Sequence, residues 1–395
     1  MRRSLGGLAV LLLCSLFWTA CGSGSGSISA NVNPQVAQGT VYMTASDAPL
    51  PSVLSFQVTI QSITLFNGTS NVTLMNTPTD VEFSRLQGLR TLLALNSVPA
   101  GTYTSATVTL ASPVISYLDI TTVPSSVSTI NGSLLNNQVS YTFNQPLNVT
   151  ANGLGGLHFH FNLHDSLQLD GSGQITGVVD PHIQIRPLQT GDPDCDIDEF
   201  RGSLVSVDAA HNSFVLQKPH GRQFTVKVDG NTQWEGTDTI NTIAPPAIIE
   251  VAGNVQADGS ILATNVQVIT TNHAFLEGLV LNATPSTGAA TSLTVLVRAE
   301  VPVLDGIDVG KPVTLNLNSN TVFDIYRLGL TLQSLLFNNS MPVVGQRVSV
   351  AGDIDTTTNP ASFDTRRVVL HRQGLQGTYV ANSLQVTNGN NGQFM

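Results

Sequence analysis

Two stretches in the C-terminal half of the chain repeat one run of short β-forming segments. In each matched pair, apolar residues and Thr recur at alternate positions, and two of the three pairs share a Gly. The pairs are 200–204 with 276–280, 224–228 with 313–317, and 249–255 with 348–354. Alternation with this period is typical of strands. The self-similarity therefore predicts two copies of one small β unit.

The first copy reads as five strands, and the longest gap falls between the third and the fourth. The strands are expected at 200–207, 214–217, 224–228, 248–255 and 261–269. In the second copy the same gap contains a candidate helix at 326–337. Five strands with a helix after the third predict an OB-like barrel, although other small barrels have the same strand count. A second candidate helix lies at 81–95, before the repeats.

The segment before the repeats, 39–190, also consists of short alternating runs broken by Gly, Pro, Asn and Asp. This pattern indicates a β-sandwich. The predicted fold class is all-β, with an N-terminal sandwich (39–190) followed by two small five-stranded OB-like barrels (200–270 and 276–372). Residues 375–395 begin the pattern again, and we expect a partial third repeat or a C-terminal strand.

The first 20 residues have the features of a secretory signal: two Arg, an apolar stretch too short to span a membrane as a mature helix, and small residues at the end. Cys21 follows directly, and the segment resembles a bacterial lipoprotein signal, in which this Cys becomes the lipidated first residue. Trp18 departs from the Leu that such signals prefer. The alternative is an ordinary signal cleaved near Ala20, with Cys21 left free. Residues 21–38 begin with a Gly/Ser run and are expected to form a flexible tether.

These features predict an exported cell-envelope protein that is held at the membrane by a lipid anchor at Cys21. Gly22 stands where an Asp retains lipoproteins in the inner membrane of some bacteria, which favours the outer membrane. The chain has 16 Lys and Arg against 26 Asp and Glu, a formal charge of −10. This balance excludes nucleic acid as a partner, because binding to its backbone needs clustered cations. An envelope glycan or protein is the expected partner.

Two parts of the chain resemble domain families of unknown function. Residues 39–188 are similar to domain-of-unknown-function family 4382, and 200–370 resemble tandem copies of family 5666. The first resemblance rests on the segments 46–49, 58–60, 99–103, 161–166 and 180–181, and the second on the φ-x-Gly, Asn-Thr-x-aromatic and Val-Ala-Gly pieces of the repeats. One acidic strand of the first family carries His and Asn here. The resemblance implies that the protein is a cell-envelope lipoprotein. It assigns no catalytic residues to the chain.

Three of the eight His residues fall within seven positions, in the segment HFHFNLHD at 158–165. Alternate side chains of a strand share a face, so His158, His160 and His164 are expected on one face and apolar residues on the other. Same-face neighbours lie about 7 Å apart, which lets two imidazoles share one metal ion, with Asp165 or His182 as a further ligand. The segment predicts a zinc or copper site. The alternative is a half-buried strand whose exposed face carries His, with no cofactor.

Two other features are weaker candidates for binding. The segment 192–199 (DPDCDIDE) spaces carboxylates as calcium loops do, but it lacks the Gly and Glu that an EF-hand needs. It is expected to be a solvated linker. Trp234 and Phe323 hold equivalent positions in the repeats and are candidate ligand-binding residues, because OB-like barrels bind saccharides and use aromatic platforms. The alternative is that both rings cover the barrel core.

No nucleophile elbow, phosphate-binding loop, dinucleotide fingerprint or zinc-protease motif is present in the sequence. We therefore predict no catalytic residues and expect that the protein is not an enzyme. The leading hypothesis is a lipid-anchored envelope protein with a non-catalytic binding or scaffolding role. The alternatives are a metal-binding envelope protein that uses the His strand, and an envelope hydrolase with a site at a junction between modules.

Overall fold

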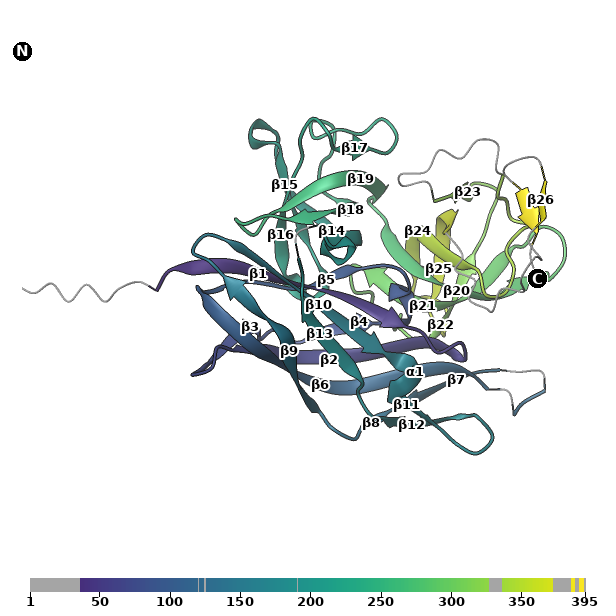
Figure 1. Cartoon of the computed structure of the whole chain (residues 1–395). Helices are drawn as coiled ribbons and strands as arrows, with labels where there is room; N and C mark the ends of the chain where they lie inside the picture. Colours follow the sequence, from purple (N-terminus) through teal and green to yellow (C-terminus); the bar gives the residue numbers. More distant parts are fainter. Residues whose placement is uncertain are drawn as a thin grey trace, which may run out of the picture. The chain divides into compact units, whose positions relative to one another are not determined.

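The computed structural model describes residues 36–371, except 120, 124–125, 190 and 327–335, and the backbone of 385–387 and 391–393. Strands dominate this part of the chain (Figure 1). Its helices are single turns: α1 (Leu163–Ser166), η1 (Ser84–Leu86), η2 (Pro193–Cys195), η3 (Ala209–His211) and η4 (Pro219–Gly221). Among the described residues, none of these helices has the length or the apolar character that crossing a bilayer requires. The predicted signal, Cys21 and nearly all of the tether lie outside the described residues.

The first module is a sandwich with its core between two main sheets. Its strands are β1 (Gln38–Ala48), β2 (Val53–Phe66), β3 (Asn71–Met75), β4 (Thr79–Glu82), β5 (Thr91–Pro99), β6 (Gly101–Asp119), β7 (Ser126–Asn131), β8 (Ser133–Leu134), β9 (Gln138–Val149), β10 (Leu154–Asn162), β11 (Leu167–Leu169), β12 (Ile175–Val179) and β13 (Ile183–Pro187). One sheet has the order β13-β10-β1-β5, and the other is built on β3-β2-β6-β7 with β4 and β9 at its edges. Phe56 on β2 meets Phe161 on β10 with ring centroids 5.2 Å apart. The predicted sandwich is confirmed.

The first sheet also contacts the first barrel with its outer face. Along β1, Val41 and Met43 point into the sandwich core, whereas Tyr42 between them joins the core of the first barrel. Leu92 on β5 does the same. Because successive side chains of a strand point to opposite faces, β1 contributes side chains to both the sandwich core and the core of the first barrel. The sandwich therefore closes one side of the barrel core.

The two barrels share one strand order. The first contains β14 (Asp196–Asp208), β15 (Ser213–Gln217), β16 (Gln223–Lys227), β17 (Gln233–Trp234), β18 (Ala247–Val255) and β19 (Ile261–Thr271); the second contains β20 (Ala274–Thr284), β21 (Ser292–Val301), β22 (Pro312–Asn316), β23 (Val322–Ile325), β24 (Arg347–Asp355) and β25 (Ser362–Leu370). Five strands close each barrel in the order β16-β15-β14-β18-β19 or β22-β21-β20-β24-β25. The closing pairs, β16 with β19 and β22 with β25, are parallel. The OB-like barrels predicted from the sequence are confirmed, and each repeat pair lies on equivalent strands.

The glycines shared by the repeats lie where two strands approach closely. A Cβ added at Gly278 would lie 2.0 Å from the carbonyl oxygen of Leu296, and one at Gly352 would lie 2.2 Å from that of Asp364. Both glycines follow a shift in strand register. Such bulges bend a strand, and a small barrel needs bent strands in order to close. The motif glycines are thus explained by barrel closure.

One predicted helix is wrong, and one falls mainly outside the described residues. Residues 81–95 form the end of β4, the turn η1 and the start of β5, with Gly88 at φ +68° between them. The apolar residues there pair with β2 and β1, so sheet pairing overrides the helical spacing. Of the candidate helix at 326–337, residues 327–335 lie outside the described part. The C-terminal segment contributes the hairpin of β26 (Gln385–Thr387) and β27 (Asn391–Gln393).

Candidate functional site

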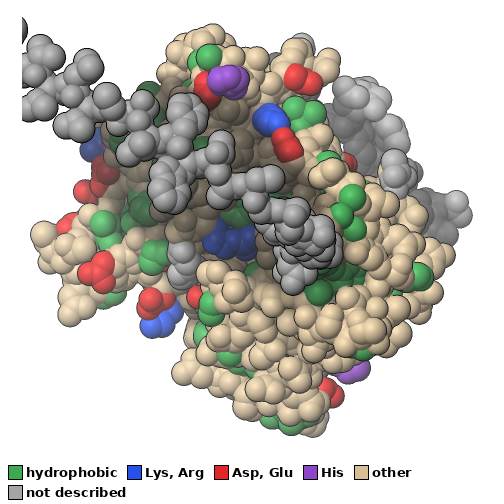
Figure 2. All heavy atoms as spheres, turned by 90° about the vertical axis from the view of Figure 1, so that its left-hand side faces the viewer, with side chains coloured by type: hydrophobic (Ala, Val, Ile, Leu, Met, Phe, Trp, Pro, Cys, Tyr) green, Lys and Arg blue, Asp and Glu red, His purple; other side chains and the backbone are tan. Residues whose placement is uncertain are grey.

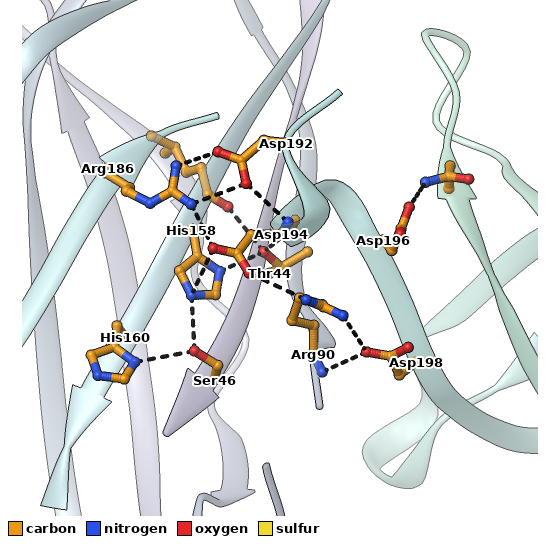
Figure 3. Close-up of polar contacts among 12 residues, drawn as sticks. Thr44, Ser46, Arg90, His158, His160, Arg186, Asp192, Asp194, Asp196 and Asp198 are labelled. Carbon is orange, nitrogen blue, oxygen red and sulfur yellow. Dashed lines mark hydrogen bonds and ion pairs between the residues drawn. The ribbon is translucent and has the colours of Figure 1, made fainter. Parts of the chain in front are cut away.

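The His strand and the acidic segment, two features far apart in the sequence, meet on the outer face of the first sheet. Figure 3 shows His158 of β10 between Thr44 and Ser46 of the neighbouring strand β1 and Asp194 of η2. The Nε2 atom of His158 lies 3.8 Å from a carboxylate oxygen of Asp194. The Thr44 hydroxyl donates to the backbone carbonyl of Asp194 at 2.9 Å. The acidic segment is therefore packed on the sandwich.

The hydrogen bonds around His158 are consistent with one neutral tautomer. Since the Thr44 hydroxyl donates to Asp194, it accepts from Nδ1 of His158 at 3.0 Å. Nε2 then accepts from the Ser46 hydroxyl at 2.8 Å, and Ser46 accepts from Nδ1 of His160 at 3.1 Å. Burial lowers the pKa of His158 to about 4, against the opposing charge of Asp194. The ring is uncharged at neutral pH.

The acidic segment is a folded ion-pair cluster, so the predicted solvated linker is wrong. Arg186 of β13 binds the carboxylates of both Asp192 and Asp194. Arg90 pairs with Asp194 at 3.4 Å and with Asp198 at 3.2 Å. The Asp192 carboxylate also caps η2 by accepting from the backbone N–H of Asp194. These contacts fix the chain where it leaves the sandwich and enters the first barrel.

The predicted metal ligands do not converge. Strand β10 ends at Asn162, whose side chain caps α1, so the alternation stops before His164 and Asp165. His164 and Asp165 pair with each other at 3.0 Å, and both are largely exposed. Only His158 and His160 keep the expected common face. Among the described residues, no group of three or more His, Cys, Asp or Glu is arranged to hold a metal ion.

The two aromatic candidates lie on equivalent strands, β17 and β23. Trp234 packs against the core of the first barrel, with Phe214 at 6.5 Å between ring centroids. Phe323 packs against the core of the second, with Phe337 at 5.7 Å. Each ring is half-buried. This placement agrees with the alternative in which the rings cover the core, and a role in ligand binding stays a prediction.

A buried ion-pair network joins the two barrels. Arg201 of β14 donates to Glu199 at 2.8 Å and also to Glu250 and Glu277. Arg347 of β24 donates to Glu277 at 2.8 Å and to Glu199. The side chains of Arg201 and Glu277 are 4 % and 0 % exposed. Two guanidinium groups thus share three carboxylates away from water.

Beside this network lies a cavity of about 710 Å³ to which all three modules contribute. The sandwich supplies residues of β4, η1 and β5, the first barrel supplies the η4 region, and the second supplies the end of β21 and the loop after it. Apolar residues form much of the wall: Leu92, Leu93, Phe224, Phe275, Val301 and Ile307. The volume falls in the range of small-molecule sites, about 300–1,000 Å³.

Basic side chains gather around this cavity although the chain is poor in them. Five of the 16 Lys and Arg line it: Arg85, Arg201, Lys218, Arg222 and Arg298. Burial, and then the charges of Arg85, Arg201 and Arg222, lower the pKa of Lys218 to about 7. Burial raises the pKa of Glu300, on β21 of the second barrel, to about 7. Figure 2 shows how few charged side chains the face in view carries.

No motif in the sequence indicates this cavity. Its basic residues are spread from Arg85 to Arg298 and meet only when the three modules assemble. One signal was present: Arg201 and Glu277 are charged residues inside the repeated φ-x-Gly strand openings. A charge at such a position in both copies indicates a buried partner.

Two parts of the chain match known protein families. Residues 38–176 match a family described as a domain of unknown function (DUF4382), and 201–267 match another, also a domain of unknown function (DUF5666). The first match covers most of the sandwich and the second covers most of the first barrel. No curated protein and no solved structure matches the chain. The DUF4382 match thus lies on the sandwich, and the DUF5666 match lies on the first barrel.

Proposed function

We propose that this protein is a lipid-anchored component of a bacterial cell envelope with a non-catalytic binding role, and that its three β modules together hold one ligand cavity. The observation that carries the proposal is the cavity of about 710 Å³ walled by all three modules. The second barrel, with the strand order of the first, is in this account a diverged copy of the DUF5666 domain.

Specific contacts between modules support a rigid cavity. The Ser116 hydroxyl of the sandwich donates to the carbonyl of Gly310 in the second barrel at 2.6 Å. The Thr40 hydroxyl donates to the carbonyl of Ala257 in the first barrel, also at 2.6 Å. Arg201 and Glu277 pair between the barrels. Rigid walls favour binding because little freedom is lost when a ligand enters.

The anchor is tested by feeding expressing cells an alkyne-labelled fatty acid and detecting the label on the full-length protein. We expect labelling of the wild type and none of Cys21→Ala. Cys195 is the matched control, because it is the other Cys that remains after the signal is removed. Cys195→Ala should keep the label. Equal labelling of wild type and Cys21→Ala would contradict the anchor, as would a mature chain that begins elsewhere.

One observation favours the hydrolase alternative. Glu300 lines the cavity, and its pKa of about 7 suits general acid–base chemistry at neutral pH. Its carboxylate also accepts the backbone N–H of Leu304 at 3.0 Å, which gives it a structural role in the loop that walls the cavity. Turnover of ester, phosphate or glycoside substrates that is lost in Glu300→Gln would establish the alternative. The non-catalytic proposal expects no turnover in either protein.

A further inference from the structure

Four basic side chains reach the cavity without a direct ion pair to any acid that the structure describes. Arg85, Lys218, Arg222 and Arg298 form no ion pair within the described part of the chain, in contrast to Arg201 beside them. They come from all three modules: Arg85 from η1, Lys218 and Arg222 from either side of η4, and Arg298 from β21. The assembly of the modules brings like charges together.

The contacts of these side chains hold them in place without an ion pair, although the charges of nearby Glu82 and Glu277 act on Arg85 and Arg298. Lys218 lies over the ring of Phe200, with its Nζ 4.7 Å from the centroid. Arg222 lies over Phe224 and donates to the carbonyl of Leu93 at 3.1 Å. Arg298 donates from Nε to the carbonyl of Leu54 at 2.6 Å. Aromatic rings and carbonyl oxygens orient a cation, but they carry only partial negative charge. None of these three contacts is made with a carboxylate.

Six acids also line the cavity wall, and most of them bind other groups of the chain: Asp80, Glu82, Glu199, Glu300, Asp305 and Asp308. The carboxylate of Glu82 accepts two backbone N–H groups, those of Phe56 and Arg85, each at 2.9 Å. Glu199 is shared by Arg201 and Arg347. Asp308 lies exposed and pairs with Lys311 at 2.8 Å. Glu300 accepts the backbone N–H of Leu304 at 3.0 Å. Asp80 and Asp305 are exposed, and Asp80 accepts the Thr59 hydroxyl at 2.6 Å.

Confined cations that lack a direct ion pair destabilise a fold unless something compensates their charge. We propose that the cavity binds a small organic anion whose head carries two or more negative charges, as a phosphate ester or a polycarboxylate does, and whose body is apolar. The head would lie among Arg85, Lys218 and Arg222, because guanidinium groups bind such oxyanions in a fixed, two-pronged geometry. The apolar body would pack on the Leu, Phe and Val walls. This inference rests on the proposed binding function and names its class of ligand.

The test is isothermal titration of the full-length protein, purified in a non-ionic detergent, at low salt and slightly acidic pH. The probes are phenyl phosphate, benzylmalonate and, as a neutral probe, benzyl alcohol. We expect at least one of the two anions to bind at one site per chain and to raise the melting temperature, while benzyl alcohol does neither. Preferred binding of phenyl phosphate assigns a phosphate ester, and preferred binding of benzylmalonate assigns a polycarboxylate. Failure of both anions to bind the wild type overturns the inference.

Lys218→Met tests whether the site is the cavity. We expect affinity to fall by about tenfold or more, because one charge-assisted contact is lost. The matched control is Arg366→Met, since Arg366 is an exposed cation paired with Asp353 outside the cavity. It should bind as the wild type does. Lys218→Arg keeps the charge and should retain binding even if the Met variant folds poorly. Equal affinity in wild type and Lys218→Met would overturn the inference.

The outcomes separate this inference from the proposed function. If no anion binds but Cys21 is lipidated, the proposed class of ligand is wrong and the proposed lipid anchor still holds. If phenyl phosphate binds and phenol is released, the site is supported and the non-catalytic function is wrong.

Discussion

Arg201 and Glu277 occupy equivalent positions in the two barrels and pair with each other. Across the strands, Arg201 is opposite Glu250 on β18, and Glu277 is opposite Ser349 on β24. The repeated fold thus carries different charges at matching positions, and the difference makes one barrel complementary to the other. Two identical copies would place like charges at this contact.

Glu277→Gln should destabilise the protein by about 3–5 kcal/mol, because it leaves buried guanidinium groups short of a charge. The matched control is Asp308→Asn, an exposed partner of Lys311, which should cost less than about 1 kcal/mol. Unfolding in urea measures the stability of both variants.

Arg201 and Arg347 hold the pKa of Glu277 far below its ordinary value against the effect of burial. Its contribution is therefore present above about pH 4.3 and is lost as the pH falls further. Equal costs for the two variants would contradict the network's role.

Gly278→Ala should destabilise the second barrel by about 2–3 kcal/mol, because its Cβ would overlap the carbonyl of Leu296 and force the strands apart. Gly101→Ala is the matched control, since a Cβ there meets nothing within 4 Å. Thermal unfolding of both variants gives the comparison. A melting temperature for Gly278→Ala equal to that of Gly101→Ala would show that the motif glycine does not serve strand approach.

Lys218→Met should stabilise the unliganded protein below neutral pH, by about 2 kcal/mol once solvent screening is allowed for. The folded pKa of about 7 lies below that of an unfolded Lys, so the charged form opposes folding. Wild-type stability then rises with pH from about 7 to about 10, and the advantage of the variant disappears over that window. Arg85, Arg201 and Arg222 are the charged groups that act on Lys218. Denaturation curves at several pH values test this, and a variant less stable than the wild type at pH 6 would refute it.

His158 should take up a proton only near pH 4, whereas an unfolded His does so near about 6.5. Stability is therefore fully present above about pH 6.5 and declines as the pH falls towards 4. NMR titration of the imidazole reports the midpoint. Ser46→Ala should raise it, because the Ser46 hydroxyl donates to Nε2 and so favours the neutral ring. An ordinary midpoint in the wild type, or no change in Ser46→Ala, would contradict this account.

The fold was predictable where alternation and repetition carry it. The strands of the first barrel expected at 214–217 and 248–255 correspond to β15 and β18 almost residue for residue, because turn residues bound them. The stretch 81–95 was misjudged because its apolar spacing suits a helix, whereas pairing with β1 and β2 is set by residues far away in the chain.

The sites were less predictable because they depend on contacts between modules. The alternation of His158 and His160 was right, but the cap at Asn162 turns His164 off the strand, and a cap of this kind is hard to weigh against alternation. Neither segment by itself indicates that Asp194 lies next to His158 in the folded protein. Lys218 and Arg298 are ordinary basic residues in the sequence, and only tertiary packing places them in one cavity.

The most direct test of the account is a crystal structure of the full-length protein grown with phenyl phosphate at a concentration that saturates it in solution. We predict the phosphate among Arg85, Lys218 and Arg222 and the phenyl ring against the apolar wall near Phe224 and Leu92. A saturated protein with the phosphate bound elsewhere, and the cavity cations paired with acids of the chain, would contradict it.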